Sequence, residues 1–88
     1  MKVPRDKSGI YMFFNNKEEL LFVGKARKLR LRIRKNFEDN VSPIKPYRDE
    51  VYKIGVIYAE DPIDREIYET YIINTLQAKY NVDKVFFR

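Results

Sequence analysis

The first part of the chain alternates short apolar runs with polar turns. Residues 10–14 (Ile-Tyr-Met-Phe-Phe) and 20–23 (Leu-Leu-Phe-Val) are separated by the polar cluster 15–19 (Asn-Asn-Lys-Glu-Glu). Short runs rich in aromatic and branched residues are typical of strands, and two of them so close in sequence predict an antiparallel hairpin. We expect the chain to turn at Gly24, directly after the second run.

A basic stretch with a helical apolar stripe follows the hairpin. Ala26, Leu29, Ile33 and Phe37 recur at spacings of three, four and four, which is the pattern of one buried helix face. Seven of the eleven residues from Lys25 to Lys35 are Lys or Arg, and none is acidic. The pattern predicts a basic helix that ends near residues 36–40.

The second half of the chain predicts a strand and a longer helix. Residues 41–49 carry two prolines and indicate a loop, and residues 51–59 form an apolar run in which Gly55 predicts a bulge or a close approach. Asp61 and Pro62 are a strong helix start, and apolar spacing continues to about Lys79. Residues 85–87 (Val-Phe-Phe) are an apolar tail that we expect to pack back or join the sheet. The order strand, strand, helix, strand, helix predicts an α+β fold with helices against a small three-stranded antiparallel sheet.

Length and composition restrict the class of protein. The 88 residues predict a single domain, residues 1–88. The chain has no cysteine and no histidine, which excludes disulfides, zinc–thiolate sites and histidine acid–base chemistry. Because no apolar run approaches the roughly 20 residues of a membrane span, we expect a soluble cytoplasmic protein that does not enter a membrane.

The positive charge is concentrated in the basic stretch. The chain has 18 basic and 13 acidic residues; without the seven of Lys25 to Lys35 the balance is 11 against 13. Like charges crowded on one helix repel one another, and a polyanion would relieve that cost. A solvated helix face is the plain alternative, but nucleic acid is the partner we favour, ahead of a membrane surface. The residues predicted to contact DNA phosphates are Arg27, Lys28, Arg30, Arg34 and Lys35.

Glu69 is the candidate for chemistry that the pattern itself singles out. It lies three, four and seven positions before Ile72, Ile73 and Leu76 and so shares their apolar helix face. A carboxylate on such a face is costly unless it is paired, protonated or bound to a metal. The pattern leaves open whether Glu69 serves a site or lies at the margin of the face and reaches solvent or an arginine.

Several motifs together resemble the GIY-YIG endonuclease superfamily. Gly9-Ile10-Tyr11 matches the first motif, and Phe22-Val23-Gly24 stands where the second is expected. The stretch 23–37 (VGKARKLRLRIRKNF), the helical Glu69 and the later Tyr-Asn-Val are most similar to the N-terminal incision domain of the bacterial nucleotide excision repair endonuclease. The resemblance covers residues 4–82.

The resemblance implies roles for individual residues. It implies that Tyr11 orients or activates the attacking water, with Lys25 nearby, and that Gly24 lets the backbone turn beside the site. It implies that Arg32 stabilises the scissile phosphate and that Glu69 holds one divalent cation, Mg²⁺ or Mn²⁺. A further matching position is Asn81, which supports the site from behind the last helix. The implied reaction is single-strand incision of DNA by phosphodiester hydrolysis, with other DNA-repair proteins as partners.

One position departs from the family pattern. The tyrosine of the second motif is Phe22 here, so a hydroxyl expected beside the metal-bound water is missing. Two hypotheses follow: Tyr11 and Lys25 share the role and the enzyme cuts, or the domain is a weakened or inactive DNA-binding module. A third interpretation is an accessory domain that recruits a repair protein through the apolar tail at residues 85–87.

Overall fold

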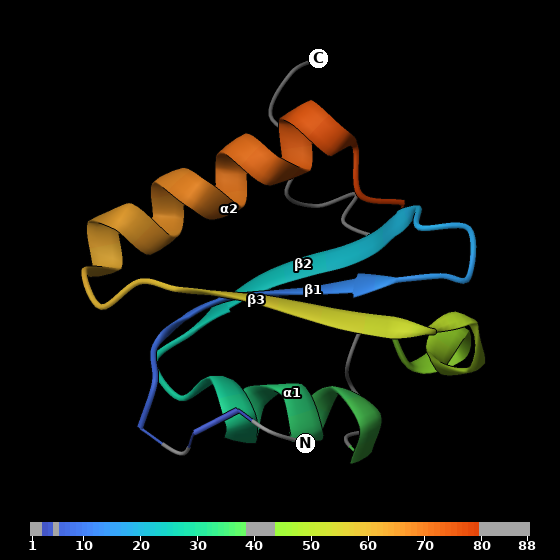
Figure 1. Ribbon diagram of the computed structural model, residues 1–88, viewed down its shortest axis with the longest axis horizontal. Helices are drawn as coiled ribbons and strands as arrows, with labels where there is room; N and C mark the ends of the chain where they lie inside the picture. Colours follow the sequence, from blue (N-terminus) through green and yellow to red (C-terminus); the bar gives the residue numbers. More distant parts are fainter. Residues whose placement is uncertain (1–2, 5, 39–43, 80–88) are drawn as a thin grey trace.

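The protein folds as a three-stranded antiparallel sheet between two helices, as Figure 1 shows for the computed structural model. The structure describes residues 3–4, 6–38 and 44–79. The elements are β1 (Gly9–Phe14), β2 (Leu20–Ala26), α1 (Leu29–Glu38), the 3₁₀ helix η1 (Lys45–Glu50), β3 (Lys53–Tyr58) and α2 (Pro62–Leu76). The predicted α+β class and the order of strands and helices are confirmed. The spatial order of the strands is β2-β1-β3, with the first strand in the centre.

The sheet separates two apolar cores because successive side chains of a strand point to opposite faces. Tyr11 and Phe13 of β1 pack with Leu29 and Ile33 of α1. Ile10 lies in the second core with residues of α2, and Met12 and Phe14 pack against that core. The central strand therefore supplies aromatic rings to one layer and mainly aliphatic side chains to the other.

The boundary between β2 and α1 differs from the prediction. Pairing with β1 continues through Gly24 opposite Tyr11 and ends with Ala26 opposite Gly9. The chain therefore does not turn at Gly24, and Lys25 and Ala26 belong to the strand. The helix begins at Leu29, whose N–H donates to the Lys7 carbonyl oxygen at 2.9 Å. The helical spacing of Ala26 was misleading, because this residue reaches the same core from the strand.

The prediction for Gly55 was wrong. The pairing of β1 with β3 runs without interruption from Phe14–Lys53 to Gly9–Tyr58, and the irregularity of the sheet lies between Phe13 and Phe14 on the β2 side. A Cβ at Gly55 would meet its neighbours at ordinary van der Waals distances of 3.4 and 3.5 Å. The close approach occurs at Gly9, where a Cβ would lie 2.0 Å from the Ile57 carbonyl oxygen.

Helix α2 starts as the sequence predicts. The Asp61 side chain accepts a hydrogen bond from the Ile63 N–H at 2.8 Å, and Pro62 occupies the first turn. Arg65 fixes the corner between β3 and α2, because its Nη1 donates to the carbonyl oxygens of Ala59 (2.9 Å) and Glu60 (2.8 Å).

The end of the second helix and the loop before β3 need a smaller correction. Helix α2 ends at Leu76, because Gln77 adopts the left-handed conformation, and not near Lys79. The predicted loop at residues 41–49 contains the 3₁₀ helix η1 in its described part. Asn81 and the apolar tail at residues 85–87 lie outside the described residues. Among the described helices none has the length and apolar character needed to cross a bilayer.

Candidate active site

The side chain of Tyr11 lies across Gly24. The two residues are cross-strand partners in the β1–β2 hairpin, and Tyr11 is only 3% exposed. A Cβ on Gly24 would come within 2.3 Å of both Cζ and Oη of Tyr11. The glycine is therefore required for space and not for a turn, and its missing side chain lets the phenol reach across β2.

A buried asparagine holds the hydroxyl of Tyr11. Asn36 of α1 donates from Nδ2 to Tyr11 Oη at 3.1 Å and to the Arg32 carbonyl oxygen at 2.9 Å. Arg48 of η1 in turn donates from Nε to the Asn36 carbonyl oxygen at 2.7 Å. Because Asn36 occupies Oη as an acceptor, the proton of Tyr11 remains free to be donated to another group.

Asn36 was missed by the sequence analysis. A signal was present: Asn36 follows Ile33 by three positions, which places it at the edge of the apolar helix stripe, where an amide needs a partner. The partner is a tyrosine 25 positions earlier, and helix periodicity alone does not identify it.

The environment of Tyr11 raises its pKa. Burial is the main cause, because it disfavours the charged phenolate. The hydrogen bond from Asn36 and the charge of Arg32 act in the opposite direction, while the charge of Glu69 raises the pKa further. Arg32 and Glu69 therefore both lie within electrostatic range of one hydroxyl, although they come from helices on opposite faces of the sheet.

Glu69 is a buried carboxylate. It is 4% exposed and lies on the inner side of α2 with Ile72 and Ile73, as its predicted position on their face requires. Leu76, predicted to share that face, is exposed instead. Within residues 3–4, 6–38 and 44–79 no three acidic side chains gather as a metal cluster. The donor set at this position thus fits a cation that takes one protein carboxylate and keeps water or phosphate oxygens as its other ligands, which is typical of Mg²⁺.

The two predicted basic residues of the site, Lys25 and Arg32, come from different elements. Lys25 is on β2 and forms an ion pair with Glu66, which precedes Glu69 by three positions on α2. Arg32 is exposed on α1. The structure thus brings the Tyr11 hydroxyl over Gly24 and within electrostatic range of Arg32 and Glu69. Lys25 is linked to the same part of α2 by its ion pair with Glu66.

Phe22 lies in the core beneath Tyr11. The two ring centroids are 6.2 Å apart, and Phe22 stacks on Phe13 at 6.2 Å with an angle of 27° between the planes. Phe22 is 9% exposed. Its ring fills the layer that supports the phenol of Tyr11, and it supplies no polar atom to the site.

The predicted phosphate-binding residues line two adjoining grooves on α1 and the turn before it. One groove, of about 450 Å³, is lined by Ala26, Arg27, Lys28, Leu31, Arg32 and Lys35. The other, of about 380 Å³, is lined by Asp6, Lys28, Arg30, Leu31 and Arg34. Lys25, which the sequence placed on the same helix, is on β2. Because Arg32 lines the first groove, the basic surface is continuous with the site around Tyr11.

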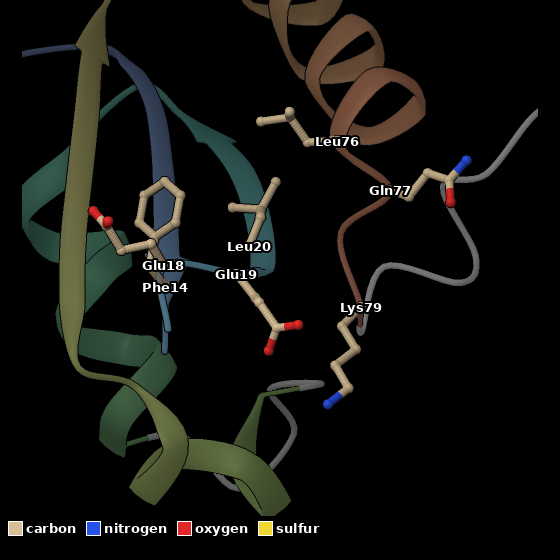
Figure 2. Close-up of a pocket in the computed structure, with 7 residues that line it drawn as sticks. All are labelled: Phe14, Glu18, Glu19, Leu20, Leu76, Gln77 and Lys79. Carbon is tan, nitrogen blue, oxygen red and sulfur yellow. The ribbon is translucent and has the colours of Figure 1, made fainter. Parts of the chain in front are cut away.

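A third hollow lies away from this site (Figure 2). It has a volume of about 420 Å³ and is lined by Phe14, Glu18, Glu19, Leu20, Leu76, Gln77 and Lys79. It is at the hairpin turn and the end of α2, and it includes none of the residues predicted to act on DNA.

Comparison with known proteins identifies the family. The model of the UvrC-like GIY-YIG domain matches residues 7–82. The chain belongs to the UvrC-like GIY-YIG domain family. The expected resemblance is thereby confirmed at the level of the family and of the fold.

Two kinds of relatives are similar to this chain in sequence. The uncharacterized protein YurQ of Bacillus subtilis (strain 168) is 70% identical over 87 residues, which are 99% of this chain and 70% of that protein. The UvrABC system protein C of Nautilia profundicola is 34% identical over 85 residues, or 88% of this chain. The chain spans only 14% of the length of that second relative.

Solved structures agree with the GIY-YIG fold. The N-terminal endonuclease domain of UvrC from Thermotoga maritima, bound to magnesium as its catalytic divalent cation, superposes with a TM-score of 0.79 at 23% identity. The superposition covers 90% of this chain and 88% of that chain. A tyrosine-to-phenylalanine variant of the same domain, also bound to its catalytic divalent cation, gives a TM-score of 0.78 at 25% identity and the same coverage.

Proposed function

We propose that this GIY-YIG domain is a metal-dependent DNA endonuclease that hydrolyses one phosphodiester bond in one strand. The observation that supports this most directly is that the buried hydroxyl of Tyr11 lies within electrostatic range of both Arg32 on α1 and Glu69 on α2. A tyrosine, an arginine and one carboxylate are what the family resemblance requires for this reaction.

Each side chain has a part that follows from its position. Tyr11 accepts a hydrogen bond from Asn36 and stays protonated at neutral pH, so it orients the attacking water by donating a hydrogen bond to it. Arg32 is exposed beside the basic groove and binds the scissile phosphate, where it offsets the charge that develops in the transition state. Lys25, paired with Glu66, contributes a positive charge beside the water.

Glu69 is the residue that would hold the divalent cation, Mg²⁺ or Mn²⁺. A bound cation supplies electrostatic stabilisation of the phosphate and lowers the pKa of a coordinated water. The matching domain of Thermotoga maritima UvrC carries a catalytic divalent cation, and its tyrosine-to-phenylalanine variants keep it. Because that domain holds its cation without one of its tyrosine hydroxyls, the missing hydroxyl at Phe22 is compatible with cation binding here.

The proposed substrate is double-stranded DNA, bound through its phosphates. The grooves of α1 present the predicted phosphate-contacting residues, and contacts to phosphates alone give no sequence preference. We assign the incision to the excision-repair type because of the resemblance to UvrC, and repair proteins in the cytoplasm are the proposed partners. Asn81 is proposed to support the site from behind α2.

A second candidate function is DNA binding without cleavage, which the missing hydroxyl at Phe22 favours. Conversion of supercoiled plasmid to open circles with Mg²⁺ or Mn²⁺ distinguishes the two. Nicking that stops when the cation is chelated supports the endonuclease. Salt-sensitive DNA binding without nicking under either cation contradicts the endonuclease and supports the binding module.

A further inference from the structure

Strand β3 is the least covered strand of the sheet. Helices α1 and α2 both pack mainly on β1 and β2. None of the six residues of β3 is buried, whereas β1 and β2 each contain at least four buried residues. Because β3 is also an edge strand, within the described residues both of its faces are only partly covered, with Val56 packed against the core on one of them, and one row of its backbone groups faces outward.

Most of the exposed side chains of β3 are apolar. Ile54 and Ile57 are 40% and 39% exposed, and Tyr58 is 51% exposed. Lys53 is the one charged residue of the strand, and its Nζ lies 2.9 Å from Glu18 Oε1. An edge strand of this kind is a template for pairing with another strand, and its segment Ile54 to Tyr58 carries none of the charged side chains with which edges are usually protected.

We propose that β3 is the interface of a homodimer in which two copies pair their β3 strands antiparallel and form one continuous sheet. An antiparallel pair of identical strands satisfies a two-fold axis, so the edge is complementary to itself. The distribution of charge also favours a second copy of this chain as the partner. The chain has a net charge of +5, but Ile54 to Tyr58 carries no charge, so two copies meet there without repulsion. DNA is disfavoured at this edge, since Lys53 is already paired with Glu18 and Lys7 Nζ lies 5.8 Å from the centroid of the Tyr58 ring.

The hydrogen-bond alternation suggests the centre of the pairing. The N–H of Ala59 donates to the Ser8 carbonyl oxygen at 2.8 Å and so points inward to β1. By alternation, the backbone groups of Ile54, Val56 and Tyr58 point outward. An axis at Val56 places Ile54 of each copy opposite Tyr58 of the other, which is a favourable branched–aromatic pair across strands.

The geometry is compatible with an open active site in both copies. The site described above lies on the β2 side, and β2 is the opposite edge of the sheet. The proposal concerns a different edge and does not depend on whether the domain cuts DNA.

Sedimentation of the whole chain tests the dimer. We expect a mass of twice 10.7 kDa at high micromolar concentration. Ile54→Lys should return the mass to that of one chain, while the matched control Ile63→Lys, at an exposed position on α2, should remain dimeric. A single-chain mass for the unmodified protein over the whole range, or a dimer that Ile54→Lys does not change, would overturn the proposal.

Crosslinking tests the pairing of two β3 strands if the Ile54→Lys variant fails to fold. The chain has no cysteine, so Val56→Cys and Ile63→Cys each introduce one thiol. A short thiol-to-thiol reagent should join two copies of Val56→Cys and leave Ile63→Cys as single chains. Equal crosslinking of both variants, or crosslinking of Ile63→Cys alone, would contradict pairing through β3.

Discussion

The hydroxyl of Tyr11 occupies the space that a side chain at position 24 would take. A Cβ there would lie 2.3 Å from Tyr11 Oη, so the glycine of β2 and the phenol of β1 form one unit. The Tyr11 hydroxyl also accepts the hydrogen bond from Asn36, and the charges of Arg32 and Glu69 act on its pKa. The position of one hydroxyl therefore depends on a residue that has no side chain.

Gly24→Ala should displace Tyr11. The new methyl group cannot share the space of the phenol, and overpacking of this kind costs about 1–3 kcal/mol of stability. We expect nicking to fall by about tenfold or more, because a misplacement of about 1 Å in a positioning group can cost about 10²-fold in rate. Gly55→Ala is the matched control, since a Cβ there meets only ordinary contacts. Equal losses in the two variants would contradict the spatial role of Gly24.

Tyr11 should make stability fall at high pH. Its pKa is raised in the folded state, so the unfolded chain loses the proton first. The contribution of Tyr11 to the free energy of unfolding is fully present below the ordinary pKa of 10.0. It decreases above that pH, by up to about 1.4 kcal/mol per pH unit for one group. Tyr11→Phe should lack this part of the decrease in urea unfolding followed between pH 9 and 11.

Removing the hydrogen bond from Asn36 to Tyr11 should raise the pKa of Tyr11 further. Asn36→Leu removes a hydrogen bond that lowers the pKa of Tyr11, so the tyrosinate absorbance of that residue should appear at still higher pH. An unchanged titration in this variant, with the fold intact, would contradict the contact.

Salt should weaken DNA binding in proportion to the phosphates contacted. If about four phosphates are bound, the slope of log K against log salt should be about −3.6 on duplex DNA. Replacing Arg30 and Arg34 by Gln should reduce the magnitude of the slope by about 1.8. Lys17→Gln, on the exposed hairpin turn, is the control. A slope that is flat in the unmodified protein would remove the nucleic-acid interpretation of the basic surface.

Phe22→Tyr should increase nicking. It restores the hydroxyl that the family pattern places in the second motif, next to Tyr11 in the aromatic layer. We expect a gain of about tenfold in rate, equivalent to about 1.4 kcal/mol. Phe13→Tyr is the control because Phe13 lies fully buried in the same layer, where a hydroxyl has no such role. A lower rate in Phe22→Tyr with unchanged stability would show that the phenylalanine is the functional residue.

Much of the fold could be predicted because local patterns decided it. The apolar runs around 10–14 and 20–23 form the hairpin, and Asp61 with Pro62 starts α2 where expected. The end of β2 could not be predicted, because pairing with β1 outweighs the helical spacing of Ala26. The family resemblance, and not periodicity, supplied Tyr11, Arg32 and Glu69 together.

Contacts between distant residues were the part that the sequence did not disclose. The role of Gly24 depends on the position of a ring thirteen residues earlier, and a glycine in a sequence equally suggests a turn. The bond between Asn36 and Tyr11 and the ion pair between Lys25 and Glu66 likewise join separate elements. Such pairs are set by the packing of helices on the sheet, which periodicity does not specify.

The central claim is that Glu69 carries the chemistry of the site, and plasmid nicking with Mg²⁺ and with Mn²⁺ tests it most directly. Glu69→Gln keeps the size of the side chain and removes its charge, and Asp64→Asn makes the same change on an exposed position of α2. We predict that Glu69→Gln lowers the nicking rate by about a hundredfold or more, the scale of losing one group that stabilises transition-state charge, while Asp64→Asn nicks like the unmodified protein. Equal nicking by Glu69→Gln and the unmodified protein under both cations would contradict the account.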